Sequence, residues 1–305
     1  MWRLGYLGLY PLAAPAQEAA NDLLLGMREL GYVRDRDYTI HFRDGAGRAE
    51  NLPERARELV AMKPDLIIAY GGVDTQAVLA ETKSIPVVMI YGPDPVAMGF
   101  AQTLGRPGGN ATGLSRLAPE LTAKRLELLR ELQPTLARVA VLWDLALGSI
   151  EHASAVGWGA VDGALRSLAA SRVMLPVREA KDLVGAFEIA RRSGAGAVVL
   201  GPESALISGE ITRVSALAAR HKMLSIAERD IYARGGILMA YGPDIHSMAR
   251  RAATYIDKIL RGSNPAELPI EQPTRFTLAI NLNTAKALEL AIPPSLRLRA
   301  DEVIE

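Results

Sequence analysis

The feature that most constrains the fold is an alternation of short apolar runs with longer amphipathic stretches, repeated about every 30 residues. Most of the apolar runs are rich in Val, Ile and Leu and lack strict polar alternation, which is typical of parallel strands covered on both faces. The runs lie at 4–9, 38–42, 66–70, 87–91, 139–143, 173–177, 197–200, 224–227, 237–241 and 277–281, and amphipathic stretches between them include 16–30, 53–62, 119–132, 209–221 and 245–260. This order predicts an α/β protein built from βαβ units in doubly wound parallel sheets.

The length of 305 residues favours two sheets of about five strands over one sheet of ten. The break is expected within 106–119, where Pro, Gly, Asn and Ser crowd together in the run that begins Arg106-Pro107-Gly108-Gly109-Asn110. Gly31 and Gly262 follow amphipathic stretches at the position of a helix C-cap glycine.

Composition argues against several classes of protein. The formal net charge is +1 and no Lys/Arg-rich run occurs, so nucleic acid is not expected as a partner. There is no cysteine, which excludes disulfides and thiol catalysis, and no apolar run reaches the roughly 18–20 residues of a membrane span. Residues 1–6 run directly into a strand-like segment without the pattern of a signal peptide, so either a leader was trimmed or the protein is not exported.

Motifs for catalysis, cofactors and metals are missing. No phosphate-binding loop or G-x-S-x-G elbow occurs, and Gly5-Tyr6-Leu7-Gly8 lacks the remaining spacing of a dinucleotide fingerprint. The four histidines are far apart in the sequence and form no ligand pair. We therefore expect no cofactor, no metal and no enzymatic activity, although a carboxylate pair such as Asp144 with Glu203 is an enzymatic alternative that would require turnover.

Polar and aromatic residues gather where the predicted strands end, which is where parallel sheets bind ligands. Glycines 71 and 72 open a helix whose N-terminus suits a carboxylate, acidic side chains suit an ammonium group, and aromatic rings suit an apolar body. The candidate ligand-binding residues are Tyr10, Gly72, Asp74, Thr75, Tyr91, Asp94, Trp143, Asp144, Glu203, Ser204, Glu228 and Tyr241.

Several of these residues also have a purely structural interpretation. Asp74 or Thr75 can simply cap its helix, Trp143 can be core, and Asp244 is expected to be the N-cap of the stretch that follows it. The repeated Tyr-Gly-Pro-Asp at 91–94 and 241–244 indicates two walls of one site, or only ordinary turn residues.

Several segments resemble the ABC-transporter substrate-binding proteins of the tryptophan/tyrosine-type group, from about Leu4 to Glu305. They are RELGYV (28–33), YGPDPV (91–96), LGRPGGNATGLS (104–115), APEL (118–121), KRLELL (124–129), YGPD (241–244), RAATYIDKIL (251–260) and INLNTAKAL (280–288). Tyr91, Asp94 and Thr75 of this chain match the pattern of that family's ligand site in the first lobe. The second lobe departs from the pattern at Trp143-Asp144-Leu145, at 201–204 and at 228–230, in its ligand-reading loops.

The resemblance implies a periplasmic-binding-protein type I fold, with two Rossmann-like parallel-sheet lobes joined by three crossovers near 112–119, 237–241 and 275–281. The N-terminal lobe would comprise 1–115 and 242–276, and the C-terminal lobe 116–241 and 277–305. It implies the solute-binding component of an ABC importer, which closes by hinge motion on a small amino acid-like or aromatic/carboxylic ligand in the inter-lobe cleft.

The implied partner is a membrane permease. We expect a monomer in the periplasm, or one anchored outside the cytoplasmic membrane. The alternative is a cytoplasmic ligand-sensing regulatory domain on the same fold, although no DNA-binding helix-turn-helix precedes Leu4.

Overall fold

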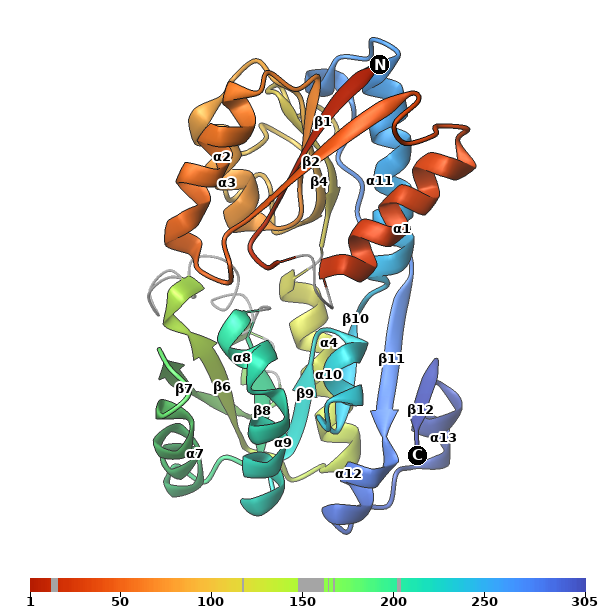
Figure 1. The fold of residues 1–305 in the computed structure, drawn as a ribbon. Coiled ribbons are helices and arrows are strands. Elements are labelled where there is room, and N and C mark those ends of the chain that lie inside the picture. The colour runs from red at the N-terminus through yellow and green to blue at the C-terminus, as the bar shows by residue number, and fades with distance from the viewer. Residues whose placement is uncertain (12–15, 117, 148–161, 164, 167, 202–203) are drawn as a thin grey trace. The chain divides into compact units, whose positions relative to one another are not determined.

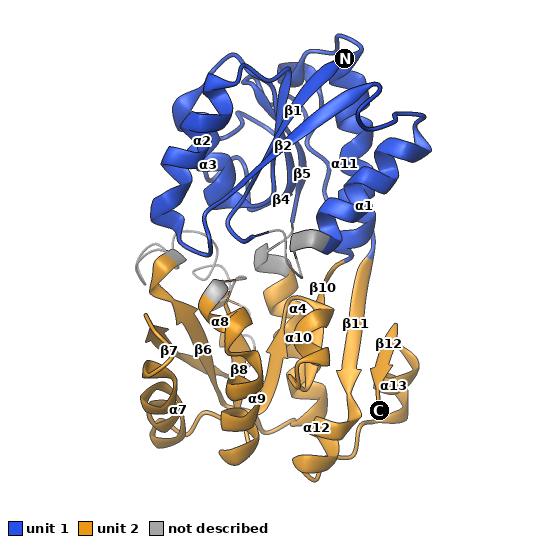
Figure 2. Ribbon diagram, viewed as in Figure 1, with its two compact units in different colours: residues 1–117, 244–275 blue, residues 118–243, 276–305 orange. Residues whose placement is uncertain are grey.

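The computed structural model describes residues 1–11, 16–116, 118–147, 162–163, 165–166, 168–201 and 204–305. The chain divides into two compact units, of which unit 1 comprises residues 1–117 and 244–275 and unit 2 comprises residues 118–243 and 276–305 (Figure 2). The chain therefore passes between the units three times, within two residues of the predicted boundaries at 115/116, 241/242 and 276/277. The residue boundaries of the two lobes stay a prediction.

Unit 1 contains a five-stranded parallel sheet in the order β2-β1-β3-β4-β5 (Figure 1). Its elements are β1 (Trp2–Gly8), α1 (Ala16–Glu29), β2 (Tyr38–Asp44), η1 (Ala49–Asn51), α2 (Leu52–Ala61), β3 (Leu66–Ala69), α3 (Gly72–Glu81), β4 (Val87–Gly92), β5 (Ala111–Ser115), α11 (Ile245–Leu260) and η4 (Pro265–Glu267).

Unit 2 contains a seven-stranded sheet in the order β12-β11-β10-β9-β8-β6-β7. Its described elements are α4 (Ala118–Leu132), β6 (Arg138–Asp144), η2 (Leu145–Leu147), β7 (Ser171–Val177), α7 (Asp182–Arg192), β8 (Ala197–Leu200), α8 (Ala205–Gly209), α9 (Ile211–Arg220), β9 (Leu224–Ala227), α10 (Asp230–Arg234), β10 (Met239–Pro243), β11 (Phe276–Asn281), α12 (Leu282–Ala287), α13 (Pro294–Leu298) and β12 (Glu302–Ile304).

The prediction of entirely parallel sheets is wrong at one pair, because β10 and β11 are antiparallel. The cause is the connection between them. The chain leaves unit 2 after Pro243, forms α11 in unit 1 and returns at Phe276, which is the register partner of Pro243. A strand that re-enters beside the point where its neighbour left must run in the opposite direction.

Each sheet is covered on both faces, because successive residues of its strands point to opposite sides. In unit 1, Ile68 packs in a hydrophobic cluster with residues of α1 and α11, whereas Ile67 packs in a cluster with residues of α2 and α3. In unit 2, Val141 packs with residues of α4, and Leu142 packs with residues of α7 and α9. This double covering explains the unbroken apolar runs of the sequence.

The predicted helix-ending glycines are confirmed. Gly31 has a φ of 90° and Gly262 a φ of 98°. In both places the next residue donates its backbone N–H to the carbonyl five residues earlier, Tyr32 to Met27 (3.0 Å) and Ser263 to Lys258 (2.9 Å). This is the pattern of a Schellman cap, which needs a left-handed residue and so favours glycine.

Candidate ligand-binding site

Two tyrosines and an arginine meet at the carboxyl edge of the unit 1 sheet. Tyr70 follows β3, Tyr91 lies near the end of β4, and their rings are stacked with centroids 6.2 Å apart. Arg116 follows β5, and its guanidinium carbon lies 5.3 Å from the centroid of the Tyr91 ring. This distance is in the range of a cation–π interaction. Both rings are buried, with exposed fractions of 5% and 4%, in the hydrophobic cluster that also contains residues of α1 and α11, so the group places a positive charge over a packed aromatic pair.

The start of α3 is held by its own side chains. The Asp74 carboxylate accepts the backbone N–H of Gly71 (2.8 Å), and the Thr75 hydroxyl donates to the Gly71 carbonyl (2.7 Å). Both side chains are buried, with exposed fractions of 1% and 0%. These bonds support the structural alternative, in which the two residues stabilise the beginning of the helix.

Gly72 is required by packing within unit 1. A Cβ atom at this position would lie 2.8 Å from Cγ of Pro93. The lack of a side chain therefore reflects the close approach of the loop that follows β4. Packing against Pro93 therefore accounts for Gly72 without a ligand.

Asp94 and Tyr10 lie at the same carboxyl edge as Tyr91. Asp94 is exposed, and its Oδ1 accepts the backbone N–H groups of Val96 (3.0 Å) and Ala97 (3.1 Å), so it caps a turn. Tyr10 lies two residues after β1, is half-buried and packs against the cluster beneath α2 and α3. The candidate residues of unit 1 therefore lie at the carboxyl edge of the same sheet.

In unit 2, a buried arginine joins two of the predicted residues. Glu228 directly follows β9, and Tyr241 lies in the neighbouring parallel strand β10. Arg125 of α4 donates from Nε to the Tyr241 carbonyl (2.7 Å) and places Nη2 3.7 Å from Oε1 of Glu228. The side chains of Arg125 and Glu228 are 4% and 7% exposed, so this ion pair is buried.

Trp143 and Asp144 end β6, and Ser204 follows β8. Trp143 is 1% exposed and belongs to the hydrophobic cluster that includes residues of α4, which supports its alternative interpretation as core. Asp144 accepts the backbone N–H of Ala146 (2.8 Å), and Ser204 caps α8 by accepting the N–H of Ile207 (3.0 Å). Glu203 lies outside the described residues.

Four further residues at these strand ends were not among the sequence-based candidates: Tyr70, Arg116, Arg125 and Arg229. A signal for Arg125 was present, because it lies one helical turn from Leu121 and from Leu129 on the apolar face of α4, where a charged side chain needs a partner. Arg229, with an exposed fraction of 3%, follows Glu228 directly. No local pattern indicated Arg116, because the Tyr91 ring that it contacts belongs to the neighbouring strand β4 and is adjacent only in the folded sheet.

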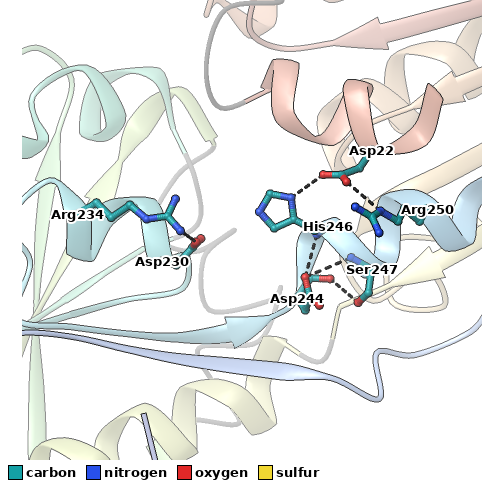
Figure 3. Close-up of polar contacts among 7 residues, drawn as sticks. All are labelled: Asp22, Asp230, Arg234, Asp244, His246, Ser247 and Arg250. Carbon is teal, nitrogen blue, oxygen red and sulfur yellow. Dashed lines mark hydrogen bonds and ion pairs between the residues drawn. The ribbon is translucent and has the colours of Figure 1, made fainter. Parts of the chain in front are cut away.

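The predicted N-cap at Asp244 is confirmed. Its Oδ1 accepts the backbone N–H groups of His246 (3.0 Å) and Ser247 (3.2 Å) at the start of α11 (Figure 3). A cavity of about 410 Å³ adjoins this end of the helix and is lined by Asp244, His246, Ser247, Arg250, Arg251 and Arg275.

Carboxylates already pair with two of the arginines that line this cavity. Arg250 donates to Asp22 (3.0 Å), and Arg251 forms a two-point ion pair with Glu271 (2.6 and 2.8 Å). We therefore assign no ligand to the cavity.

Two other kinds of site are absent from the described residues. No three His, Asp or Glu residues come together there in a way that could hold a metal ion. Within the same ranges, each helix is too short or too polar to serve as a membrane span.

The two α/β units have the fold of the periplasmic type I binding proteins. The chain belongs to the family of ABC transporter substrate-binding proteins, whose family model matches residues 11–304. Members of this family bind a substrate for an ABC transporter and do not turn it over, as the sequence analysis predicted.

Relatives of the chain extend over nearly its whole length. A tyrosine-binding protein of Clostridioides difficile is 25% identical over 281 residues, which are 90% of this chain and 77% of that protein. A crystal structure of an ABC domain in complex with L-Trp from Streptococcus pneumoniae has a TM-score of 0.89 and 22% identity and covers 99% of both chains. A leucine-binding protein from Thermotoga maritima has a TM-score of 0.65 and 14% identity, covering 88% of this chain and 85% of that one.

Proposed function

We propose that this chain binds an aromatic amino acid outside the cytoplasmic membrane and delivers it to the permease of an ABC importer. The observation that carries the proposal is the group of Tyr70, Tyr91 and Arg116 at the carboxyl edge of the unit 1 sheet. Stacked aromatic rings suit the ring of a ligand, and a guanidinium suits its carboxylate. The tyrosine-binding relative and the L-Trp complex support the same class of ligand.

The ammonium group of such a ligand needs an acidic partner. The carboxyl edge of the unit 2 sheet supplies Glu228 and Asp144, which are 6% and 3% exposed. We propose that Glu228 receives the ammonium group of the ligand and that Arg116 receives its carboxylate.

Calorimetric titration and thermal unfolding with a ligand panel test this proposal. The panel contains L-tryptophan, L-tyrosine, L-phenylalanine and L-leucine, the desamino analogues, which keep the carboxylate, and tryptamine and tyramine, which keep the ammonium. An aromatic amino acid at 100 times its Kd is expected to stabilise the protein by about 2.7 kcal/mol. Binding of none of the aromatic amino acids would overturn the proposal.

Variants test the assignment of the carboxylate partner. Arg116→Gln is expected to weaken binding of the amino acid about tenfold or more, while binding of the matching amine changes little, because the amine has no carboxylate to lose. Arg106→Gln, at an exposed arginine in a turn of the same unit, is the matched control and should leave both affinities unchanged. Equal losses for amino acid and amine in Arg116→Gln would contradict the assignment.

A further inference from the structure

Arg125 is a buried charge in an otherwise apolar stripe of α4. Its side chain is 4% exposed, and the neighbouring turns of the same face carry the buried Leu121 and Leu129. An arginine at such a position destabilises the fold unless its donors are satisfied. The contacts of the Arg125 guanidinium must therefore account for its presence in this helix.

The guanidinium of Arg125 connects the carboxyl ends of two adjacent strands. Nε donates to the carbonyl of Tyr241 in β10 (2.7 Å), and Nη2 lies 3.7 Å from the Glu228 carboxylate after β9. Nη1 lies 3.4 Å from the hydroxyl of Thr122, one turn earlier on α4. The planar guanidinium of one side chain thus links α4 to the ends of two strands. A lysine carries a single point charge and cannot make these separate contacts.

We propose that Arg125 is a positioning residue: it holds Glu228 and Tyr241 in the geometry that receives the ammonium group of the ligand. This inference rests on the proposed function. Nη2 of Arg125 lies 3.7 Å from the Glu228 carboxylate, which is within the range of an ion pair that orients this carboxylate beside Tyr241. Arg125 would therefore govern affinity through Glu228 without contacting the ligand.

Four variants separate positioning from mere stabilisation: Arg125→Lys, Arg125→Met, Glu228→Gln and the double variant Arg125→Met/Glu228→Gln. For each variant the Tm is measured, together with two dissociation constants. The first is for L-tryptophan or L-tyrosine, whichever binds wild type more tightly. The second is for the desamino analogue of that amino acid. Arg125→Lys is expected to bind the amino acid about tenfold more weakly. Its affinity for the desamino analogue should stay unchanged, because that analogue has no ammonium group.

The double variant supplies the decisive comparison. Arg125→Met alone leaves Glu228 buried without this partner, so the Tm of the variant should fall. Removing both charges should restore Tm toward the wild-type value, whereas the amino acid affinity should remain low. Recovery of Tm and affinity together would overturn the positioning role.

Arg130→Lys is the matched control. Arg130 lies on the same helix and donates to the carbonyls of Leu136 (2.9 Å) and Leu168 (2.6 Å), away from the carboxyl ends of the strands. This variant should lower Tm without changing Kd. If wild-type protein binds no aromatic amino acid, the proposed function fails and this inference fails with it. If wild type binds and Arg125→Lys retains its Kd, only the positioning role is overturned.

Discussion

At the residue scale, two glycines are needed for different physical reasons. Gly113 in β5 has a φ of 121°, and a Cβ atom there would lie 2.3 Å from the carbonyl oxygen of Met89 and 2.7 Å from its nitrogen. The ladder between β4 and β5 is irregular after Met89, where the two backbones approach closely. Gly31, which ends α1, has a positive φ, but a Cβ atom there would have no neighbour within 4 Å.

Alanine substitutions separate these two effects. Gly31→Ala should lower the free energy of unfolding by about 1 kcal/mol, because only the left-handed backbone is strained. Gly113→Ala should cost more than about 3 kcal/mol, because the new methyl group also collides with backbone that cannot move aside. Urea denaturation of both variants checks the order, and equal losses would contradict the proposed backbone contact.

At the element scale, α1 and α11 pack closely because small residues line their contact. A Cβ atom on Gly26 would lie 2.8 Å from the carbonyl oxygen of Arg250 and 2.9 Å from Cβ of Ala253. The same two helices are joined at their polar edge by Asp22, which contacts His246 (2.5 Å) and Arg250 (3.0 Å) (Figure 3). Steric fit and ion pairing therefore fix the same helix pair.

Gly26→Leu should force these helices apart and lower the free energy of unfolding by about 2–3 kcal/mol or more. Gly185→Leu is the matched control, because Gly185 is an exposed glycine within α7 whose Cβ position has no neighbour within 4 Å. The control should stabilise the protein by several tenths to about 1 kcal/mol through helix propensity. Chemical denaturation of both variants measures the difference, and a neutral Gly26→Leu would refute the close contact.

A second feature at this scale is the segment 268–271, which covers the outer edge of β5. The backbone of Glu271 donates to Gly113 (3.0 Å) and accepts from Ser115 (2.9 Å). The buried Thr112 hydroxyl donates to the carbonyl of Leu268 (2.7 Å). The segment thus satisfies backbone groups that an edge strand would otherwise expose.

Thr112→Val keeps the shape of the side chain and removes its donor. The free energy of unfolding should fall by about 1 kcal/mol, because the Leu268 carbonyl loses a buried hydrogen bond. Thr135→Val, at an exposed threonine of unit 2, should be close to neutral. Thermal and urea unfolding of both variants provide the measurement, and identical effects would show that the Thr112 hydrogen bond contributes nothing.

At the scale of the whole molecule, positive and negative formal charges nearly balance. The pH dependence of the free energy of unfolding is therefore set by individual ion pairs. The ion pair with Arg251 lowers the pKa of Glu271 below its usual value, and partial burial opposes this shift. A carboxyl group with a lowered folded-state pKa stabilises the fold above its unfolded pKa. That contribution is lost as pH falls through the lower folded-state value.

Glu271→Gln should therefore be less stable than wild type at pH 7, by no more than about 1 kcal/mol because the Glu271 side chain is 37% exposed. The deficit should shrink as pH falls below about 4.3, the ordinary pKa of a glutamate, because wild type then progressively loses the same interaction. Glu267→Gln, at an exposed glutamate of the same connection, is the control. Urea titrations across this pH range check the trend, and a deficit independent of pH would contradict it.

Most elements of the fold could be predicted from the sequence, which also predicted a ligand site at the carboxyl edges of the strands. Runs such as 197–200 and 224–227 coincide with β8 and β9, because burial on both faces leaves an unbroken apolar signature in local sequence. β5 and β12 were missed, since Ala111–Ser115 contains Gly and Thr within a turn-rich segment and Glu302–Ile304 is only three residues long. The ends of parallel strands then placed Tyr91 and Tyr241 at carboxyl edges.

Which side chains meet at these edges, and which way β11 runs, depends on contacts between elements that are distant in the chain. Arg125 and the Tyr241 carbonyl are 116 residues apart in the chain, so no local pattern could have paired them. Trp143 and Gly72 likewise took their roles from packing partners on other elements. Hydrophobic periodicity is a property of neighbouring residues, whereas a binding edge is assembled from strands that are distant in sequence and meet only through sheet order.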